Sequence, residues 1–170
     1  MDTSTVLTDA FRRIPELVQR ACEGLDVASL VYRPGPGANS IAWLVWHLSR
    51  IQDDHIAEIA GMDQVWADPV WAEMTGIDRD LLATGFGDTP DDVAAVVPLS
   101  AAALVAYNAA VTKRTVSYLA SVDTSEFDRI IDRSYDPPVS VGVRLISVIS
   151  DNLQHAGQAN YLRGILERLA

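Results

Sequence analysis

Three side chains in the sequence have the types and the spacing of a metal site, namely His47, Asp151 and His155. Asp151 and His155 are four residues apart, a spacing that aims two side chains of one helix at the same ion. His47 lies far from them along the chain, at the edge of an apolar helical face. One carboxylate and two imidazoles leave a fourth position open for water or substrate, which is the arrangement of a catalytic metal centre.

The Asp151–His155 pair stands in the middle of an otherwise apolar helical stripe. A buried carboxylate without a partner is costly, so the sequence must supply something that compensates it. Three compensations are compatible with the spacing. Asp151 could pair with an arginine such as Arg114 or Arg144, it could bond His155 directly, or both residues could bind a metal ion together with a ligand from another helix.

The second histidine of the same segment, His55, is a rival to His47 as the ligand. It falls near the centre of the apolar face and two turns further along the predicted helix. Both histidines also fit a simpler interpretation, in which the imidazole is hydrogen-bonded at a helix interface. Asp54 and Glu58 are expected to be solvated or to lie at the mouth of the site.

Long amphipathic helices must position these residues. Apolar side chains recur at helical spacing in four segments, which predict helices over 5–24, 40–60, 100–121 and 142–169. Pro15 is expected to kink the first helix or to mark the start of its main body. The connection 62–98 is interrupted by proline and glycine and should contain short helices, one of them opened by Thr89-Pro90-Asp91-Asp92. The connection 122–141 is expected to be irregular, and no convincing strand is visible, so the fold class is all-α, a four-helix bundle.

Composition excludes several classes of function. With 170 residues, the chain 1–170 fits a single domain. Its net charge of −10 argues against nucleic acid and against anionic membranes as partners. No apolar run approaches the ~20 residues of a bilayer span, and no signal-peptide pattern is present. Cys22 is the only cysteine, which excludes an internal disulfide and a zinc site of several cysteines within one chain. One lysine against twelve arginines suggests a GC-rich bacterium as the source.

The residues around the three candidate ligands resemble the DinB-like metalloprotein superfamily. The resemblance is carried by Trp46-His47-Leu48-Ser49-Arg50 and by the segment Asp-Asn-Leu-Gln-His-Ala-Gly-Gln-Ala-Asn-Tyr-Leu-Arg-Gly at 151–164, and it covers nearly the whole chain. It implies a four-helix bundle that holds a divalent metal, often zinc, with His47, Asp151 and His155 as ligands. The carboxylate at the first position of the last-helix pair is similar to the actinobacterial, thiol-using branch. That branch includes mycothiol S-transferases and the N-terminal domain of mycothiol-dependent maleylpyruvate isomerase.

The resemblance implies a metal-dependent S-transferase that conjugates a low-molecular-weight thiol, mycothiol, to an electrophile, as in detoxification. The open metal position would bind the sulfur of the thiol, and coordination would deprotonate it. Arg50, Asn152 and Gln158 are candidates to contact the thiol cofactor or to support the ligands. Cys22 lies on the apolar stripe of the first helix and is expected to be a core residue rather than the nucleophile. A mycothiol-making actinobacterial host and a reducing cytoplasm fit the arginine bias and the single cysteine.

Two other functions remain open on the sequence alone. The same metal site could activate water to hydrolyse an amide or an ester, with Asp54 or Glu58 as the general base. A bundle without catalysis could instead bind a small apolar ligand or a partner in a pocket lined by its four tryptophans, Trp43, Trp46, Trp66 and Trp71. The sequence is also compatible with a homodimer.

Overall fold

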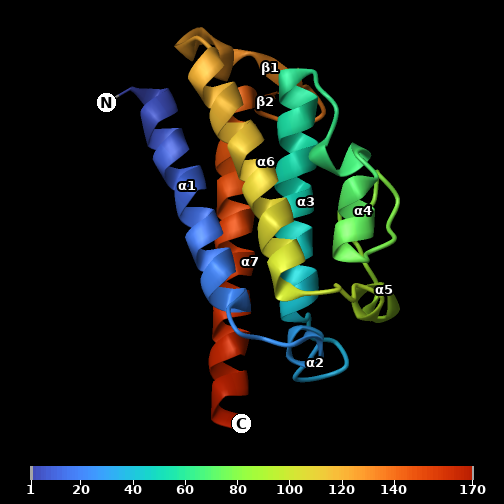
Figure 1. Ribbon diagram of the computed structural model, residues 1–170. Coiled ribbons are helices and arrows are strands. Elements are labelled where there is room, and N and C mark those ends of the chain that lie inside the picture. Colours follow the sequence, from blue (N-terminus) through green and yellow to red (C-terminus); the bar gives the residue numbers. More distant parts are fainter. Residues whose placement is uncertain (1, 170) are drawn as a thin grey trace.

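The computed structural model describes residues 2–169, so the two end residues of the predicted domain, 1 and 170, lie outside it (Figure 1). Within this range four long helices form the bundle that the apolar stripes predict, and the all-α fold class is confirmed. The long helices are α1 (Thr3–Cys22), α3 (Ile41–Ala60), α6 (Ala101–Ser121) and α7 (Val141–Leu169).

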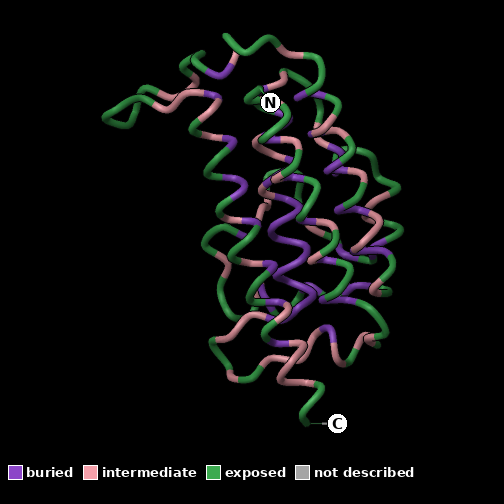
Figure 2. Tube along the Cα trace, turned by 90° about the vertical axis from the view of Figure 1, so that its left-hand side faces the viewer, coloured by how far each residue is buried: buried purple, intermediate pink, exposed green. Residues whose placement is uncertain are grey.

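The four helices pack as a square whose opposite corners are α1 with α3 and α6 with α7. Neighbouring helices pack along their length, whereas α1 and α3 scarcely touch. The buried residues line the inward sides of the helices and form one core (Figure 2). None of the helices in residues 2–169 combines the length and the apolar character that a membrane crossing needs.

The predicted helix ends rest on identifiable caps. The Ser40 hydroxyl accepts a hydrogen bond from the backbone N–H of Trp43 at 3.1 Å, and Ser100 caps α6 in the same way. Gly61 ends α3 with a φ of 63°, a left-handed conformation that glycine adopts without a steric penalty. The start of α3 therefore has a fixed position, and with it the turn that carries His47.

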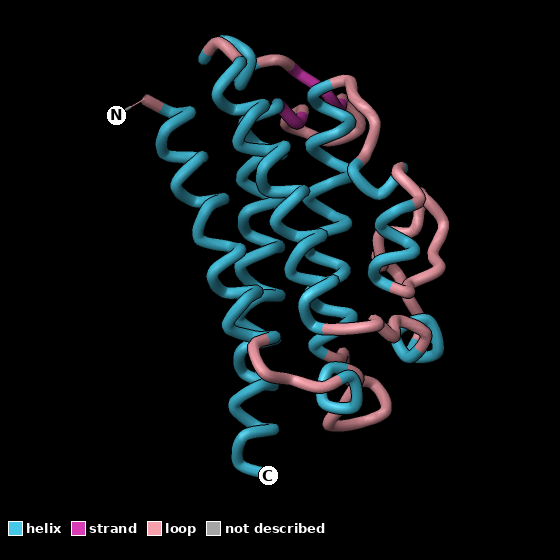
Figure 3. Tube along the Cα trace, in the orientation of Figure 1, coloured by secondary structure: helices cyan, strands magenta, loops and turns pink. Residues whose placement is uncertain are grey.

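The long middle connection contains short helical segments, as predicted. They are the 3-10 segment η1 (Val65–Ala67) and the helices α4 (Val70–Thr75) and α5 (Pro90–Ala94). Thr89 caps α5 in a reciprocal capping box with Asp92, and Pro90 is its first residue. A further single turn, α2 (Val27–Leu30), follows α1. The segments of the middle connection lie along the outer side of α3, whereas α2 lies at the end of the bundle near the start of α3 (Figure 1 and Figure 3).

Two details of the prediction were wrong. Pro15 does not mark the start of the main helix body, because α1 begins at Thr3, capped by Asp2, and continues through Pro15 with buried residues on both sides of it. The connection after α6 contains η2 (Thr124–Asp128) and a small antiparallel pair, β1 (Ile130–Asp132) with β2 (Val139–Ser140). Strands this short carry too few residues for an alternating pattern to stand out.

Candidate metal centre

Helices α3 and α7 run antiparallel and side by side, and their facing turns bring the three predicted ligands together (Figure 1). One nitrogen or oxygen atom from each of His47, Asp151 and His155 lies within 4.8 Å of the other two. The two imidazole rings meet edge to face with their centroids 4.8 Å apart. Nε2 of His155 lies 3.5 Å from Oδ1 of Asp151. This cluster can bind a metal ion.

Each of the two histidines of the cluster has a hydrogen-bond partner that orients its ring. Nδ1 of His47 lies 2.6 Å from the carbonyl oxygen of Thr84, and Nδ1 of His155 lies 3.0 Å from Oε1 of Gln158. Both oxygens accept hydrogen bonds, so Nδ1 carries a proton in each ring, and Nε2 is the nitrogen that remains for a metal ion. Metal-ligating histidines characteristically hold their second nitrogen in this way.

Asp151 gives the strongest indication that the residues fit a cation. Its Oδ2 atom is buried and has no hydrogen-bond partner, which is costly for a carboxylate oxygen. Neither arginine considered as a partner reaches it, because Arg144 donates to His55 and Glu58, and Arg114 donates to the carbonyl of Asp63. A divalent ion shared with the two imidazoles satisfies this oxygen, and the donor set suits zinc.

The electrostatic surroundings of the two histidines differ. Burial lowers the pKa of His47, and the hydrogen bond to Thr84 opposes that effect. The hydrogen bond with Asp151 raises the pKa of His155, against the effect of burial. His47 is therefore favoured as the neutral imidazole that a metal requires. At His155, the Asp151 carboxylate stabilises a positive charge on Nε2, which can be a proton or a bound metal ion.

Trp43 forms one wall of the cluster. Its ring stacks on His47 with centroids 4.5 Å apart and an angle of 11° between the planes, and it meets His155 edge-on. The indole N–H donates to Asp88 at 2.9 Å, and Asp88 is held in turn by Arg79 at 2.7 Å. The Trp43 ring is therefore held by stacking on His47 on one side and by the hydrogen bond to Asp88 on the other.

The other tryptophans pack mainly against neighbouring aromatic rings, and Trp71 also borders a hollow of about 340 Å³. Trp46 and Trp66 are buried and pack edge to face on each other. Trp71 is partly buried and packs against Tyr107. These rings fill the core beside α3 and the middle connection rather than line a common cavity.

His55 belongs to a separate polar group and not to the metal cluster. Its Nδ1 accepts a hydrogen bond from Arg144 at 2.9 Å and lies 3.7 Å from Asp54 and 3.8 Å from Glu58. The carboxylate of Asp54, a candidate base, accepts a hydrogen bond from the side chain of Gln64 at 2.8 Å. The structure places these side chains beyond the cluster, toward the start of α7.

The three candidate cofactor-binding residues lie in different surroundings. Gln158 is exposed and bonds His155, so it supports a ligand directly. Asn152 is fully buried and donates to Gln52 within the bundle. Arg50 is also fully buried, and each of its guanidinium nitrogens donates to a protein acceptor, which leaves it nothing to offer a thiol cofactor. Of the two roles considered for Arg50, only a supporting one is compatible with this burial.

The loop 79–88 is a part of the site that the sequence analysis missed. Its Thr84 carbonyl holds His47, and Gly85 lies so close to this ring that an added Cβ would come within 2.7 Å of Nδ1. Gly85 has a φ of 93°, which side chains rarely adopt. The glycines at 85 and 87 were the only available signal, because a backbone carbonyl has no residue type.

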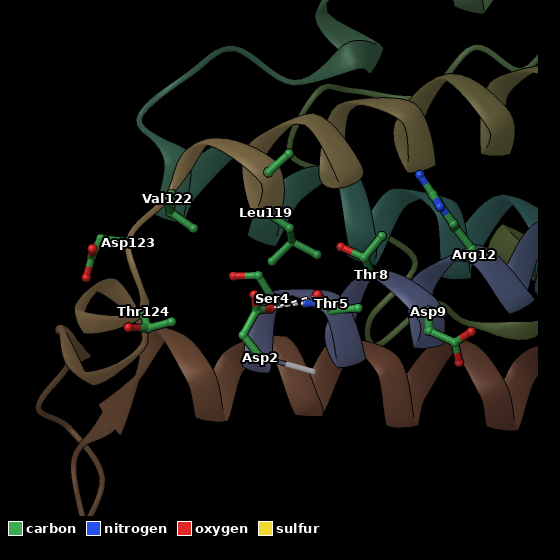
Figure 4. A pocket seen from close by; sticks show the side chains of 11 residues that line it. Asp2, Ser4, Thr5, Thr8, Asp9, Arg12, Leu119, Val122, Asp123 and Thr124 are labelled. Carbon is green, nitrogen blue, oxygen red and sulfur yellow. Dashed lines mark hydrogen bonds between the residues drawn. The ribbon is translucent and has the colours of Figure 1, made fainter.

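Two hollows flank the cluster. One, of about 200 Å³, lies beside Gln158 and is lined mainly by apolar side chains, among them Leu44, Tyr161 and Leu162. The other follows the exposed face of α7 to Asp151 and includes the polar residues Ser147, Ser150 and Gln154. A further hollow lies between the first turns of α1 and the end of α6, and none of the three cluster residues lines it (Figure 4).

Cys22 is not available as a nucleophile. Its side chain is 1% exposed, and burial raises the pKa of the thiol to about 12. We expect the native protein at mildly alkaline pH to react with a thiol reagent such as dithionitrobenzoate far more slowly than the protein unfolded in urea, since only the thiolate is reactive. The release of the coloured thiolate measures both rates. Equal rates in the two states would show that Cys22 is accessible.

A family model described as the DinB superfamily matches residues 10–159. A solved structure, described as the crystal structure of a conserved protein from Enterococcus faecalis, is 31% identical and superimposes with a TM-score of 0.88. The match covers 96% of this chain and 96% of that one. No curated protein matches the chain.

Proposed function

The chain belongs to the DinB superfamily, and on that premise we propose that it is a metal-dependent S-transferase which conjugates a low-molecular-weight thiol, mycothiol, to an electrophile. The observation that carries the proposal is the cluster of two imidazoles and one carboxylate with a buried, unpartnered Oδ2. Three protein ligands leave a position for a further group, as catalytic rather than structural metal sites do.

The chain's own side chains prepare this site for a thiol. When bound, a divalent ion such as zinc would lower the pKa of a thiol ligand and so supply the reactive thiolate at neutral pH. His47 and His155 present Nε2 to the site because Thr84 and Gln158 hold their Nδ1 protons. Trp43 covers one side of His47 and excludes water from it. Asp151 would offset only one of the two positive charges of a divalent ion, so the occupied site would still attract an anionic sulfur.

The two flanking hollows support a reaction between two small molecules. The hollow beside Asp151 has a mixed lining, in which Ser147, Ser150 and Gln154 could meet the sugar hydroxyls of the thiol. The apolar hollow beside Gln158 suits an uncharged part of the electrophile. Two arginines adjoin the apolar hollow in sequence but have other partners. Arg33 donates to backbone carbonyls, and Arg163 donates to the carbonyl of Glu23 and to the carboxylate of Glu167. This lining favours an uncharged substrate over a carboxylate.

Small molecules in the cytoplasm of an actinobacterium are the partners that this proposal implies. The net charge of −10 supports small-molecule chemistry over nucleic-acid binding, because neutralising a phosphate backbone requires a basic face. The literal meaning of the superfamily's name, which refers to DNA damage, therefore receives no support from the charge of this chain.

Conjugation of mycothiol to monochlorobimane tests the proposal. We expect the zinc-loaded protein to raise the rate of fluorescent conjugate formation well above the rate without protein, and His47→Ala to return it to that background. His55→Gln, which alters a histidine outside the cluster, serves as the control and should retain the activity. Turnover of an amide or ester panel without conjugation would instead assign hydrolysis, and no turnover of either kind would assign a binding protein.

A further inference from the structure

Arg50 is a fully buried cation in the middle of α3, and its side chain is hydrogen-bonded to the backbone of the loop 79–88. It donates to the backbone carbonyls of Leu81 at 2.6 Å and Ala83 at 3.3 Å. Its other donors reach side-chain oxygens of Asp53, Tyr107 and Gln64. All the guanidinium nitrogens are therefore used, and two of the bonds fix the backbone of the loop 79–88.

Asp53 holds this guanidinium in place. Its Oδ2 lies 3.2 Å from Arg50 and also accepts from the Tyr107 hydroxyl at 2.9 Å. Both of its oxygens accept backbone N–H bonds as well, from Val65 at 2.7 Å and from Trp66 at 2.8 Å. Because each partner is bonded on several sides, the Arg50–Asp53 pair has little freedom to move.

The same loop orients the metal ligand His47. The carbonyl of Thr84, next to the carbonyl of Ala83 that Arg50 holds, accepts the Nδ1 proton of His47. Trp43 reaches the far end of the loop through Asp88. Trp43, His47 and Arg50 stand at i, i+4 and i+7, which is one face of a helix. One face of α3 is therefore hydrogen-bonded to the loop at three successive turns.

We propose that Arg50, held by Asp53, is a positioning residue for the metal site, which fixes the loop 79–88 so that the Thr84 carbonyl keeps His47 in the Nδ1–H form. A buried ion pair rarely stabilises a fold better than apolar residues of the same size, so its presence here calls for another role. Partners behind a ligating histidine commonly change metal affinity about 10- to 100-fold when they are lost. The inference rests on the proposed metal site, but the expected Nδ1–H form of His47 applies to the metal-free protein as well.

Arg50→Lys tests the inference, because lysine keeps the charge beside Asp53 but lacks the planar fork that reaches two carbonyls. Long-range 1H–15N spectra of the metal-free protein report which nitrogen of His47 carries the proton. We expect one form, Nδ1–H, in the parent chain and a mixture in Arg50→Lys. Zinc affinity, measured by competition with a chromophoric chelator, should fall about tenfold or more.

Arg129→Lys is the matched control. Like Arg50, Arg129 donates to a backbone carbonyl, but this is the carbonyl of Ile59, at 2.6 Å, near the end of α3 and away from the loop 79–88. It should leave both the His47 proton and the zinc affinity unchanged. If Arg50→Lys does not fold, Gly85→Ala displaces the loop from the other side, because its Cβ would meet the His47 ring. The same two changes are then expected.

A folded Arg50→Lys or Gly85→Ala protein that keeps the single Nδ1–H form and the parent zinc affinity would overturn the inference. The two measurements also separate this inference from the proposed function. A parent chain that binds no zinc contradicts the transferase proposal, whereas the position of the His47 proton still decides whether Arg50 acts on this ring.

Discussion

Replacing His47 by alanine is expected to abolish stable binding of a divalent metal ion. Of the three cluster residues, His47 is the only one on α3, so its loss leaves Asp151 and His155 as a two-ligand site on a single helix. Binding free energies of about 10–16 kcal/mol for four-ligand zinc sites imply about 3 kcal/mol per ligand, which corresponds to at least about 100-fold weaker binding. Elemental analysis after loading and dialysis should find one ion per parent chain and none per His47→Ala chain.

His55→Ala is the control that the chain itself offers. It removes the same type of side chain from the same helix, two turns further on, where His55 contacts Arg144 rather than the cluster. The metal content of this variant should match that of the parent. The site assignment would fail if His55→Ala lost the ion while His47→Ala kept it, and the metal proposal as a whole would fail if no purified form of the protein bound zinc, nickel or a similar ion.

The three cluster residues could be predicted because long helices carry them. A helix repeats every 3.6 residues, so the apolar stripe of α7 sets the direction of Asp151 and His155 before any tertiary contact is considered. The stripe of α3 does the same for His47 at its edge. What remained undecided was which of His47 and His55 meets α7 at the height of Asp151. That depends on how far two antiparallel helices slide along each other, and the periodicity of neither helix determines it.

The loop 79–88 and the role of Arg50 could not be predicted in the same way. An arginine is ordinarily exposed, and nothing local to Arg50 indicates that carbonyls from a segment some 30 residues away will surround it. The acceptors that hold it, at Leu81 and Ala83, are backbone atoms and have no residue type. The pairing of Arg50 with Asp53 at i, i+3 was visible in the sequence, but exposed helices carry such pairs so often that the spacing alone indicates nothing about burial.

Burial of the Arg50–Asp53 pair leads to the second large expected effect, which concerns stability. Asp53→Ala removes the anion and leaves Arg50 buried without its counter-charge. It also removes the acceptor of two backbone N–H groups and of the Tyr107 hydroxyl. Breaking a buried pair from one side typically costs about 3–5 kcal/mol. We therefore expect the free energy of unfolding to fall by about that amount, and the melting temperature by roughly 6–20 °C for a chain of this size.

Urea unfolding followed by circular dichroism measures this loss, and two further variants identify its cause. Asp9→Ala breaks an exposed pair with Arg13, in which the side chains are 62% and 70% exposed, and should change stability little because water screens such pairs. The double variant Arg50→Met/Asp53→Leu removes both charges and should recover much of the stability that Asp53→Ala loses, since a buried orphan charge costs more than an apolar replacement. If the double variant is stable but binds zinc weakly, the ion pair serves the metal site rather than the fold. If Asp53→Ala is no less stable than Asp9→Ala, water reaches Arg50 in solution and the pair cannot act as a rigid support.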